Sequence, residues 1–151
     1  MNSAIVDLLL KEYTRVGSEI WTPLLDCLVS ARSYFEGDLD LLIIYLLIGL
    51  RTLQDPRTLQ LSLQAVAEGR VATLPSLFTN VRSIAASTGI PYETVRRKVA
   101  RLVELGWVSR DDDKLALTVR ALTEFTDLRA KLFELVTANH DTVSKLLKRA
   151  S

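Results

Sequence analysis

The order of helix-breaking residues in the second half of the chain restricts the possible fold more than any other feature. Asn80 is a favoured N-cap and Gly89 a favoured helix end, so the sequence predicts a short helix over 81–88. Pro91 suits the first position of the next helix, where its missing N–H has no intrahelical partner, and that helix is expected to end at Gly106. Two β-rich stretches, WVSR and LALTV, then flank the turn sequence DDDK, which predicts a hairpin.

Helical patterns surround this block on both sides. The run LLIIYLLIGL contains no charged residue, but it is much shorter than the ~20 residues that a membrane span requires, so it predicts a helix buried on nearly every side. The helices expected outside the block cover residues 3–15, 18–35, 38–54, 57–68 and 121–148, with the first break near Gly17.

This order of elements predicts a mostly α protein: a winged helix-turn-helix with a two-stranded β wing and additional N- and C-terminal helices. The corresponding division of the chain is into N-terminal helices at 1–37, a winged helix-turn-helix domain at 38–120 and a C-terminal amphipathic helix at 121–151. The last of these is a candidate dimerisation element.

The helix expected at about 91–105 has two faces of opposite character. At about 100° per residue, Val95, Val99 and Leu102 fall on one apolar face. The other face and its flanks suit a major groove, where arginine can bond guanine, glutamate can accept from cytosine and cations can contact phosphates. The candidate DNA-binding residues on this helix are Tyr92, Glu93, Thr94, Arg96, Arg97, Lys98 and Arg101.

A charged face alone is also what a solvated surface helix would have. Three features favour a nucleic-acid contact instead. Residues 81–120 carry eight Lys and Arg against five Asp and Glu, whereas residues 1–80 carry six against nine. The short helix and tight turn before this helix are typical of a recognition helix, and a hairpin follows directly.

A further indication comes from the segment SIAASTGIPYETVRRKVARLVELGWVSRDDDKLALT. Its pattern of Ile84-Ala85, Gly89, Thr94-Val95, Leu102 and Leu105-Gly106-Trp107-Val108 resembles the winged helix-turn-helix of bacterial transcriptional regulators, MarR-like proteins among them. The resemblance covers about a quarter of the chain. It implies a winged-helix fold, double-stranded DNA as the partner, a dimeric state and the helix after Pro91 as the reading helix.

The tip of the expected wing differs from that family pattern. The family usually carries a cation there for the minor groove, whereas this chain has Asp111, Asp112 and Asp113. Three carboxylates repel phosphate, so we do not expect the wing to insert tip-first. Arg110 and Lys114, on the arms of the hairpin, are candidate contacts to the DNA backbone.

Other kinds of chemistry have little support in the sequence. The single cysteine, Cys27, excludes an intrachain disulfide and, together with an N-terminus that lacks a signal pattern, predicts a cytoplasmic location. His140 is the single histidine and lies far from Cys27 in the sequence, so no familiar zinc-ligand set exists. We therefore predict no enzyme activity, catalytic residue, metal, cofactor or membrane contact.

The apolar stripe of the C-terminal helix either packs within the chain or forms a homodimer interface with the N-terminal helices. Two-fold pairing would place two recognition helices about 34 Å apart, one turn of DNA. The predicted function is a sequence-specific DNA-binding transcriptional regulator that acts as a homodimer. The alternative is a winged-helix protein–protein interaction module that does not bind DNA. The sequence neither supports nor excludes an effector pocket among residues 3–54.

Overall fold

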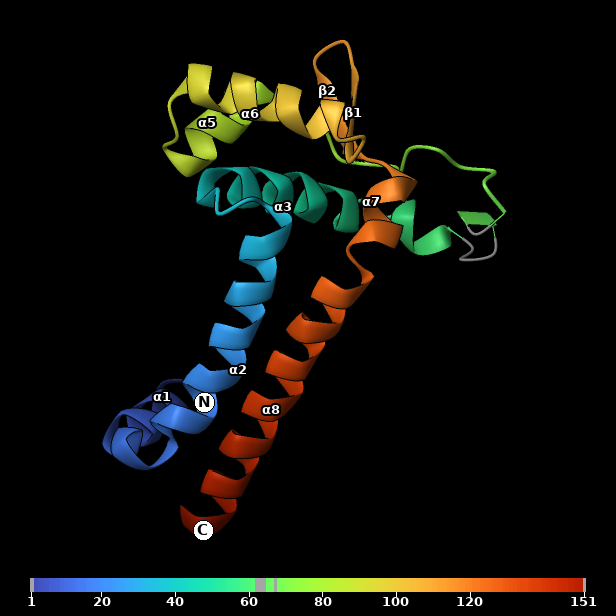
Figure 1. Ribbon diagram of the computed structural model, residues 1–151. Helices are drawn as coiled ribbons and strands as arrows, with labels where there is room; N and C mark the ends of the chain where they lie inside the picture. The colour runs from blue at the N-terminus through green and yellow to red at the C-terminus, as the bar shows by residue number, and fades with distance from the viewer. Residues whose placement is uncertain (1, 62–64, 67, 151) are drawn as a thin grey trace. The chain divides into compact units, whose positions relative to one another are not determined.

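A computed structural model of the chain describes residues 2–61, 65–66 and 68–150. The protein is mostly helical, with a two-stranded antiparallel sheet (Figure 1). Its named elements are α1 (Asn2–Lys11), α2 (Tyr13–Tyr34), α3 (Leu39–Leu53), the 3-10 helix η1 (Thr58–Gln60), α5 (Val81–Thr88), α6 (Tyr92–Glu104), β1 (Val108–Asp111), β2 (Lys114–Leu117), α7 (Val119–Glu124) and α8 (Thr126–Ala150).

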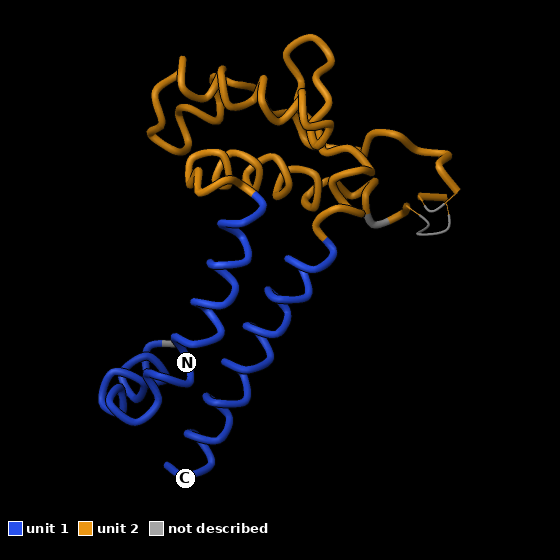
Figure 2. The backbone as a smooth tube through the Cα atoms, viewed as in Figure 1, with its two compact units in different colours: residues 1–34, 126–151 blue, residues 35–125 orange. Residues whose placement is uncertain are grey.

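The chain divides into two compact units (Figure 2). Unit 1 combines residues 1–34 with residues 126–151, and unit 2 comprises residues 35–125. The sequence placed the corresponding boundaries after residues 37 and 120 and treated the two terminal segments separately. In the structure these segments form one unit.

Unit 1 is built on the pairing of α2 and α8, which lie side by side and run in opposite directions (Figures 1 and 2). Val16 and Ala31 on α2 and Leu146 on α8 are buried, each with at most 6% of its surface exposed. Near the N-terminal end of α2 and the C-terminal end of α8, the Thr142 hydroxyl donates to a carboxylate oxygen of Glu19 at 3.1 Å.

The first helix break lies at Glu12, so the sequence prediction of a break near Gly17 is wrong. Gly17 is buried inside α2, and a Cβ at this position would stand 3.4 Å from the ring of Tyr13. That distance is ordinary van der Waals contact, and Gly17 continues the helix rather than marking a turn. An isolated glycine is tolerated inside a helix, so a helix-breaker pattern alone misplaces the break.

In unit 2, α3 packs against α5, α6 and β2. The Asp38 side chain caps it by accepting from the N–H of Leu41 at 2.9 Å. One side of α3 is fully buried at Ile44 and Ile48, whereas Leu46 and Leu50 are about half exposed. The prediction of a helix buried on nearly every side is therefore wrong, because these partners cover one side of α3.

The hairpin follows α6 in unit 2. Gly106 ends the helix in the left-handed conformation, with φ of 74°. Strands β1 and β2 then pair antiparallel with Val108 opposite Leu117, and the turn between them has Asp112 at φ 48°. Leu115 is fully buried. The expected hairpin around DDDK is confirmed.

Four aromatic rings form the centre of unit 2. Phe35 stacks on Phe125 with a centroid separation of 5.4 Å, and Tyr45 and Trp107 contact both rings. The Trp107 indole N–H donates to Glu124. Phe125 lies between α7 and α8, so the single helix predicted over 121–148 is wrong. The chain leaves helical geometry at Phe125, where its ring packs into this cluster.

The segment after α3 differs in part from the prediction of a helix over 57–68. A 3-10 helix covers Thr58–Gln60, while residues 62–64 and 67 lie outside the described part of the chain. Gly69 has φ of 68°, the expected conformation for a helix end. None of the helices in the described part of the chain combines the length and the hydrophobicity that a membrane span requires.

Candidate nucleic-acid interface

A tight turn fixes the path from α5 into α6. The Asn80 side chain accepts from the N–H of Ser83, while the Ser83 hydroxyl accepts from the N–H of Asn80, and this reciprocal pair forms a capping box at the start of α5. Gly89 ends α5 with φ of 72°, a conformation that glycine adopts without strain. After Pro91, which is the N-cap rather than the first helical residue, α6 begins at Tyr92.

The two predicted faces of α6 are present in the structure. Val95, Val99 and Leu102 are completely buried in unit 2. On the outer side Arg97 is exposed, and no described carboxylate forms an ion pair with it. Tyr92 is half exposed on the first turn. Arg97 therefore presents a free guanidinium at the surface of α6.

Two other arginines of the predicted site are already paired. Arg96 donates to Glu93 one turn earlier at 2.8 Å, and this bond raises the pKa of the Arg96 guanidinium. Arg101 lies 3.4 Å from a carboxylate oxygen of Glu36 and 3.6 Å from one of Glu104. Both arginines are about half exposed, so water screens these pairs.

Lys98 has a different environment from the arginines. Its ammonium bonds the carboxylate of Asp38, the residue that caps α3, and only 14% of the Lys98 side chain is exposed. Burial opposes the ionisation of Asp38, but the bonds from Lys98 and from the N–H of Leu41 outweigh it and lower the pKa of this carboxyl group. This bond ties α6 to the start of α3, and Lys98 offers little free charge.

The two cations of the hairpin lie in different environments. Arg110 donates to the carbonyl oxygen of Asp112 at 3.0 Å and lies 3.6 Å from the carboxylate of Asp113. Lys114 is half-buried, and its charge is one of the influences that lower the pKa of Asp55, after the bonds from Arg57. Of the two cations on the arms of the hairpin, Arg110 is therefore held by the turn and Lys114 is half-buried.

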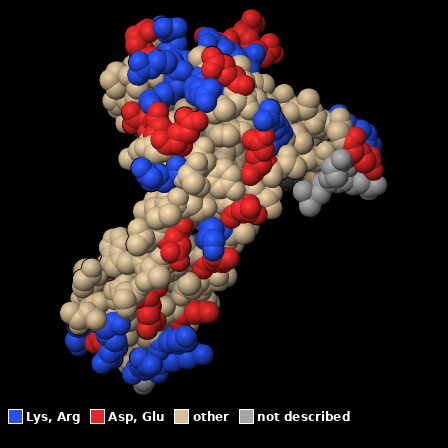
Figure 3. All heavy atoms as spheres, viewed as in Figure 1, with Lys and Arg blue, Asp and Glu red and all other residues tan. Residues whose placement is uncertain are grey.

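Figure 3 shows the charged side chains on one face of the molecule. Lys and Arg side chains gather over α5 and α6, with Asp and Glu side chains interspersed among them. Helix α6 carries seven of the predicted site residues. Of these, Lys98 and Thr94 are half-buried and the other five are exposed. Sequence reasoning did not identify Arg82, an exposed cation on the first turn of α5, nor the carboxylates Glu36 and Asp38. Arg82 lies two residues after the N-cap Asn80, so its place on the first turn of a short helix could have been predicted from the sequence.

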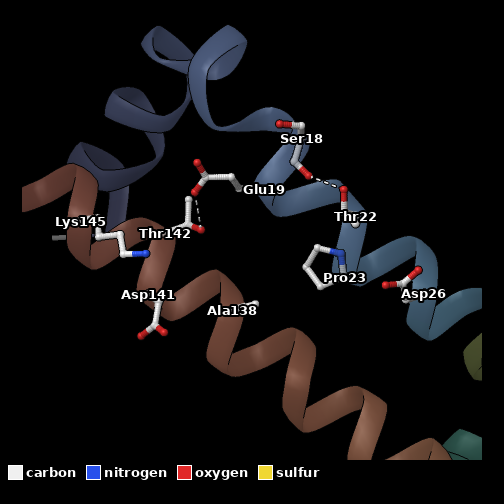
Figure 4. Close-up of a pocket in the computed structure, with 9 residues that line it drawn as sticks. All are labelled: Ser18, Glu19, Thr22, Pro23, Asp26, Ala138, Asp141, Thr142 and Lys145. Atoms are coloured by element: carbon white, nitrogen blue, oxygen red, sulfur yellow. Dashed lines mark hydrogen bonds between the residues drawn. The ribbon is translucent and has the colours of Figure 1, made fainter.

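A shallow hollow in unit 1 is a second candidate for ligand binding (Figure 4). It has a volume of about 520 Å³ and lies between α2 and α8. Three carboxylates, from Glu19, Asp26 and Asp141, line it together with Lys145. Across the described residues, no group of three or more His, Cys, Asp or Glu side chains could hold a metal ion.

Comparisons with protein-family models, with curated proteins and with solved structures found no match to this chain.

Proposed function

We propose that this protein is a winged helix-turn-helix transcriptional regulator that binds double-stranded DNA as a homodimer. In this proposal α5 and α6 are the two helices of the motif, α6 is the recognition helix and β1–β2 is the wing. The observation that carries it is the form of α6: a buried apolar side locked into unit 2 and an outer side with the free guanidinium of Arg97. Arginine is the side chain that most often reads guanine in the major groove.

The other candidate residues have graded roles in this proposal. Tyr92, Glu93 and Thr94 lie on the first turn of α6, the part of a recognition helix that usually approaches base edges. Arg96 and Arg101 would exchange their carboxylate partners for phosphates, which their exposure permits. Lys98, Arg110 and Lys114 would contribute mainly to local positive potential.

Titration against duplex DNA at several salt concentrations tests the proposal. Since bound phosphates release counterions, we expect log K to fall steeply with log salt. Arg97→Ala is expected to weaken specific binding by about 1–3 kcal/mol and to relax the preference at one base pair. The measurement is fluorescence anisotropy on a selected duplex and on single-base variants of it.

Arg15→Ala is the matched control, because Arg15 is an exposed arginine of unit 1 that pairs with Glu12. This change should leave DNA affinity within about twofold of the parent. Absence of DNA binding at low salt, or equal losses from the two substitutions, would contradict the proposal.

Support for the homodimer comes from an apolar face on unit 1. We define this face by exposed residues of the two long helices: Trp21, Leu25, Leu28 and Val29 on α2, and Leu132, Phe133 and Val136 on α8. Viewed down each helix from its N-terminus, the exposed residues lie roughly 100–120° clockwise from the buried ones. Because α2 and α8 run in opposite directions, the same clockwise offset on both helices places their exposed residues on the same side of the pair.

The size of the apolar face fits an interface between two copies. Its members are between 45% and 63% exposed. Together they offer an apolar area on the order of 700 Å² per chain, above the usual largest patch of a monomer and close to one side of a standard interface. Two-fold pairing through this face is therefore the arrangement that we propose.

The pairing of cations on α6 favours a second candidate function. Three of the four cations of this helix form ion pairs, with Glu93, Asp38 and Glu36, and the hairpin turn is acidic. Such a mixed surface also suits contact with another protein. A lack of salt-dependent DNA binding, combined with an intact fold, would place this protein-docking function first.

A further inference from the structure

The turn that leads into α3 holds a carboxylate against the proposed recognition helix. Phe35 anchors the start of this turn, because its ring is 1% exposed in the aromatic cluster. Asp38 anchors the end, through its cap on α3 and its bond to Lys98. Between the anchors, the N–H of Asp38 donates to the carbonyl oxygen of Phe35 at 2.8 Å and closes the turn.

Glu36 has an unusual backbone conformation within this turn. Its φ is 54°, in the left-handed region that non-glycine residues seldom adopt, and Gly37 follows with φ of 77°. Strained backbone of this kind persists where the surrounding structure imposes it, here through the two anchors. The consequence is that the Glu36 carboxylate lies 3.4 Å from the Arg101 guanidinium, across 65 residues of sequence.

The pair between Glu36 and Arg101 has the properties of a reversible contact. The side chain of Glu36 is 75% exposed and that of Arg101 is 46% exposed, so the attraction is screened. The Asp38–Lys98 pair, by contrast, is shielded and also caps a helix. A phosphate could replace Glu36 at Arg101 far more readily than Asp38 at Lys98.

We propose that Glu36 is a built-in competitor for a DNA phosphate at Arg101, and that this contact limits the affinity of the protein for DNA. The inference rests on the proposed DNA-binding function. Arg101 must then leave Glu36 before it contacts a phosphate. The loss of the Glu36–Arg101 pair therefore offsets part of the attraction between Arg101 and that phosphate. Weakening this competitor should strengthen the electrostatic, sequence-independent part of binding.

Glu36→Gln tests the inference, because it removes the charge and keeps the shape of the side chain. Because Arg101 contacts the phosphate in both proteins, the slope of log K against log salt should stay close to that of the parent. The gain then comes from no longer breaking one screened surface pair, so we expect affinity at 0.1 M salt to rise about two- to fivefold on duplexes of any sequence. Glu134→Gln, the same charge change in the exposed Lys131–Glu134 pair of unit 1, is the control and should give less than a twofold change.

A double-mutant cycle with Arg101→Gln separates this contact from a general effect of charge. In the Arg101→Gln background, Glu36→Gln should no longer raise affinity. An equal gain in both backgrounds, or no gain in either, would overturn the inference while leaving DNA binding intact. Failure of the parent protein to bind DNA would instead reject the proposed function itself.

Discussion

Individual carboxylates in unit 2 differ in how strongly the fold depends on their charge. Asp55 follows α3 and is buried, with 2% of its surface exposed. It accepts from the backbone N–H of Arg57 at 2.9 Å and from two guanidinium nitrogens of Arg57 at 3.0 and 2.7 Å. These bonds hold the pKa of Asp55 at about 2, below the ordinary value of 3.8.

This depressed pKa predicts a pH-dependent contribution to stability. Because the pKa is lowered in the folded state, the contribution is complete above the unfolded value near 3.8 and is lost as pH falls toward 2. Asp55→Asn should therefore be less stable than the parent at pH 5, and the difference should shrink between pH 4 and pH 2. Urea unfolding at pH 5, 4, 3 and 2 measures this convergence.

Arg57→Gln provides the control for the pH prediction. Removing the guanidinium takes away the main cause of the depressed pKa, so the stability difference between the carboxylate and the amide at position 55 should depend less on pH in this background. A difference between parent and Asp55→Asn that stays constant from pH 5 to pH 2 would contradict the assignment.

The aromatic cluster of unit 2 lies at the point where the C-terminal helical segment is divided into α7 and α8. Phe125 is 2% exposed and packs against Phe35, Tyr45 and Trp107. Deleting a buried aromatic ring removes its apolar contacts and leaves a cavity. We expect Phe125→Ala to lower the free energy of unfolding of unit 2 by about 3–5 kcal/mol.

Trp107 fluorescence during urea unfolding follows this unit, in a Trp21→Phe background that removes the signal of unit 1. Phe78→Ala serves as the comparison, since Phe78 is a phenylalanine of the same unit with 60% of its surface exposed. Its substitution should change stability by less than about 0.5 kcal/mol. Similar losses for the two variants would show that the cluster is not the centre of the unit.

Local signals explain which elements could be predicted from the sequence. The N-cap at Asn80 and the left-handed glycines Gly89 and Gly106 act over a few residues, so the bounds of α5, α6 and the hairpin were predictable within one or two residues. The break at Phe125 depends on a ring packing against residues far away in the chain. The break at Glu12 likewise could not be derived from Gly17, which lies inside α2.

The features of the candidate site could likewise be predicted only where they depend on local sequence. Periodicity alone separates buried Val95 from exposed Arg97, and the structure confirms both positions. The partners of Lys98 and Arg101 are 60 and 65 residues away in sequence, and no spacing rule connects them. Charge counting therefore identified the cations of α6 but could not tell which of them are occupied.

In the proposed homodimer, two chains combine through the apolar face of unit 1. The seven members of the apolar face on α2 and α8 remain 45–63% exposed within unit 1. If a second copy covers this face, a charge placed at its centre must be desolvated without a partner when the dimer forms. Val136→Glu is therefore expected to raise the dimer dissociation constant at least tenfold.

Sedimentation equilibrium over a range of concentrations measures this change, and Ala130→Glu is the control because Ala130 is an exposed residue of α8 outside the apolar face. The same two variants connect assembly to recognition. A dimer contacts two half-sites, so its affinity for a two-fold symmetric duplex should exceed that for a single half-site, and Val136→Glu should remove this advantage while leaving half-site binding intact. A parent protein that remains monomeric at high concentration, or a Val136→Glu variant as dimeric as the control, would refute pairing through this face.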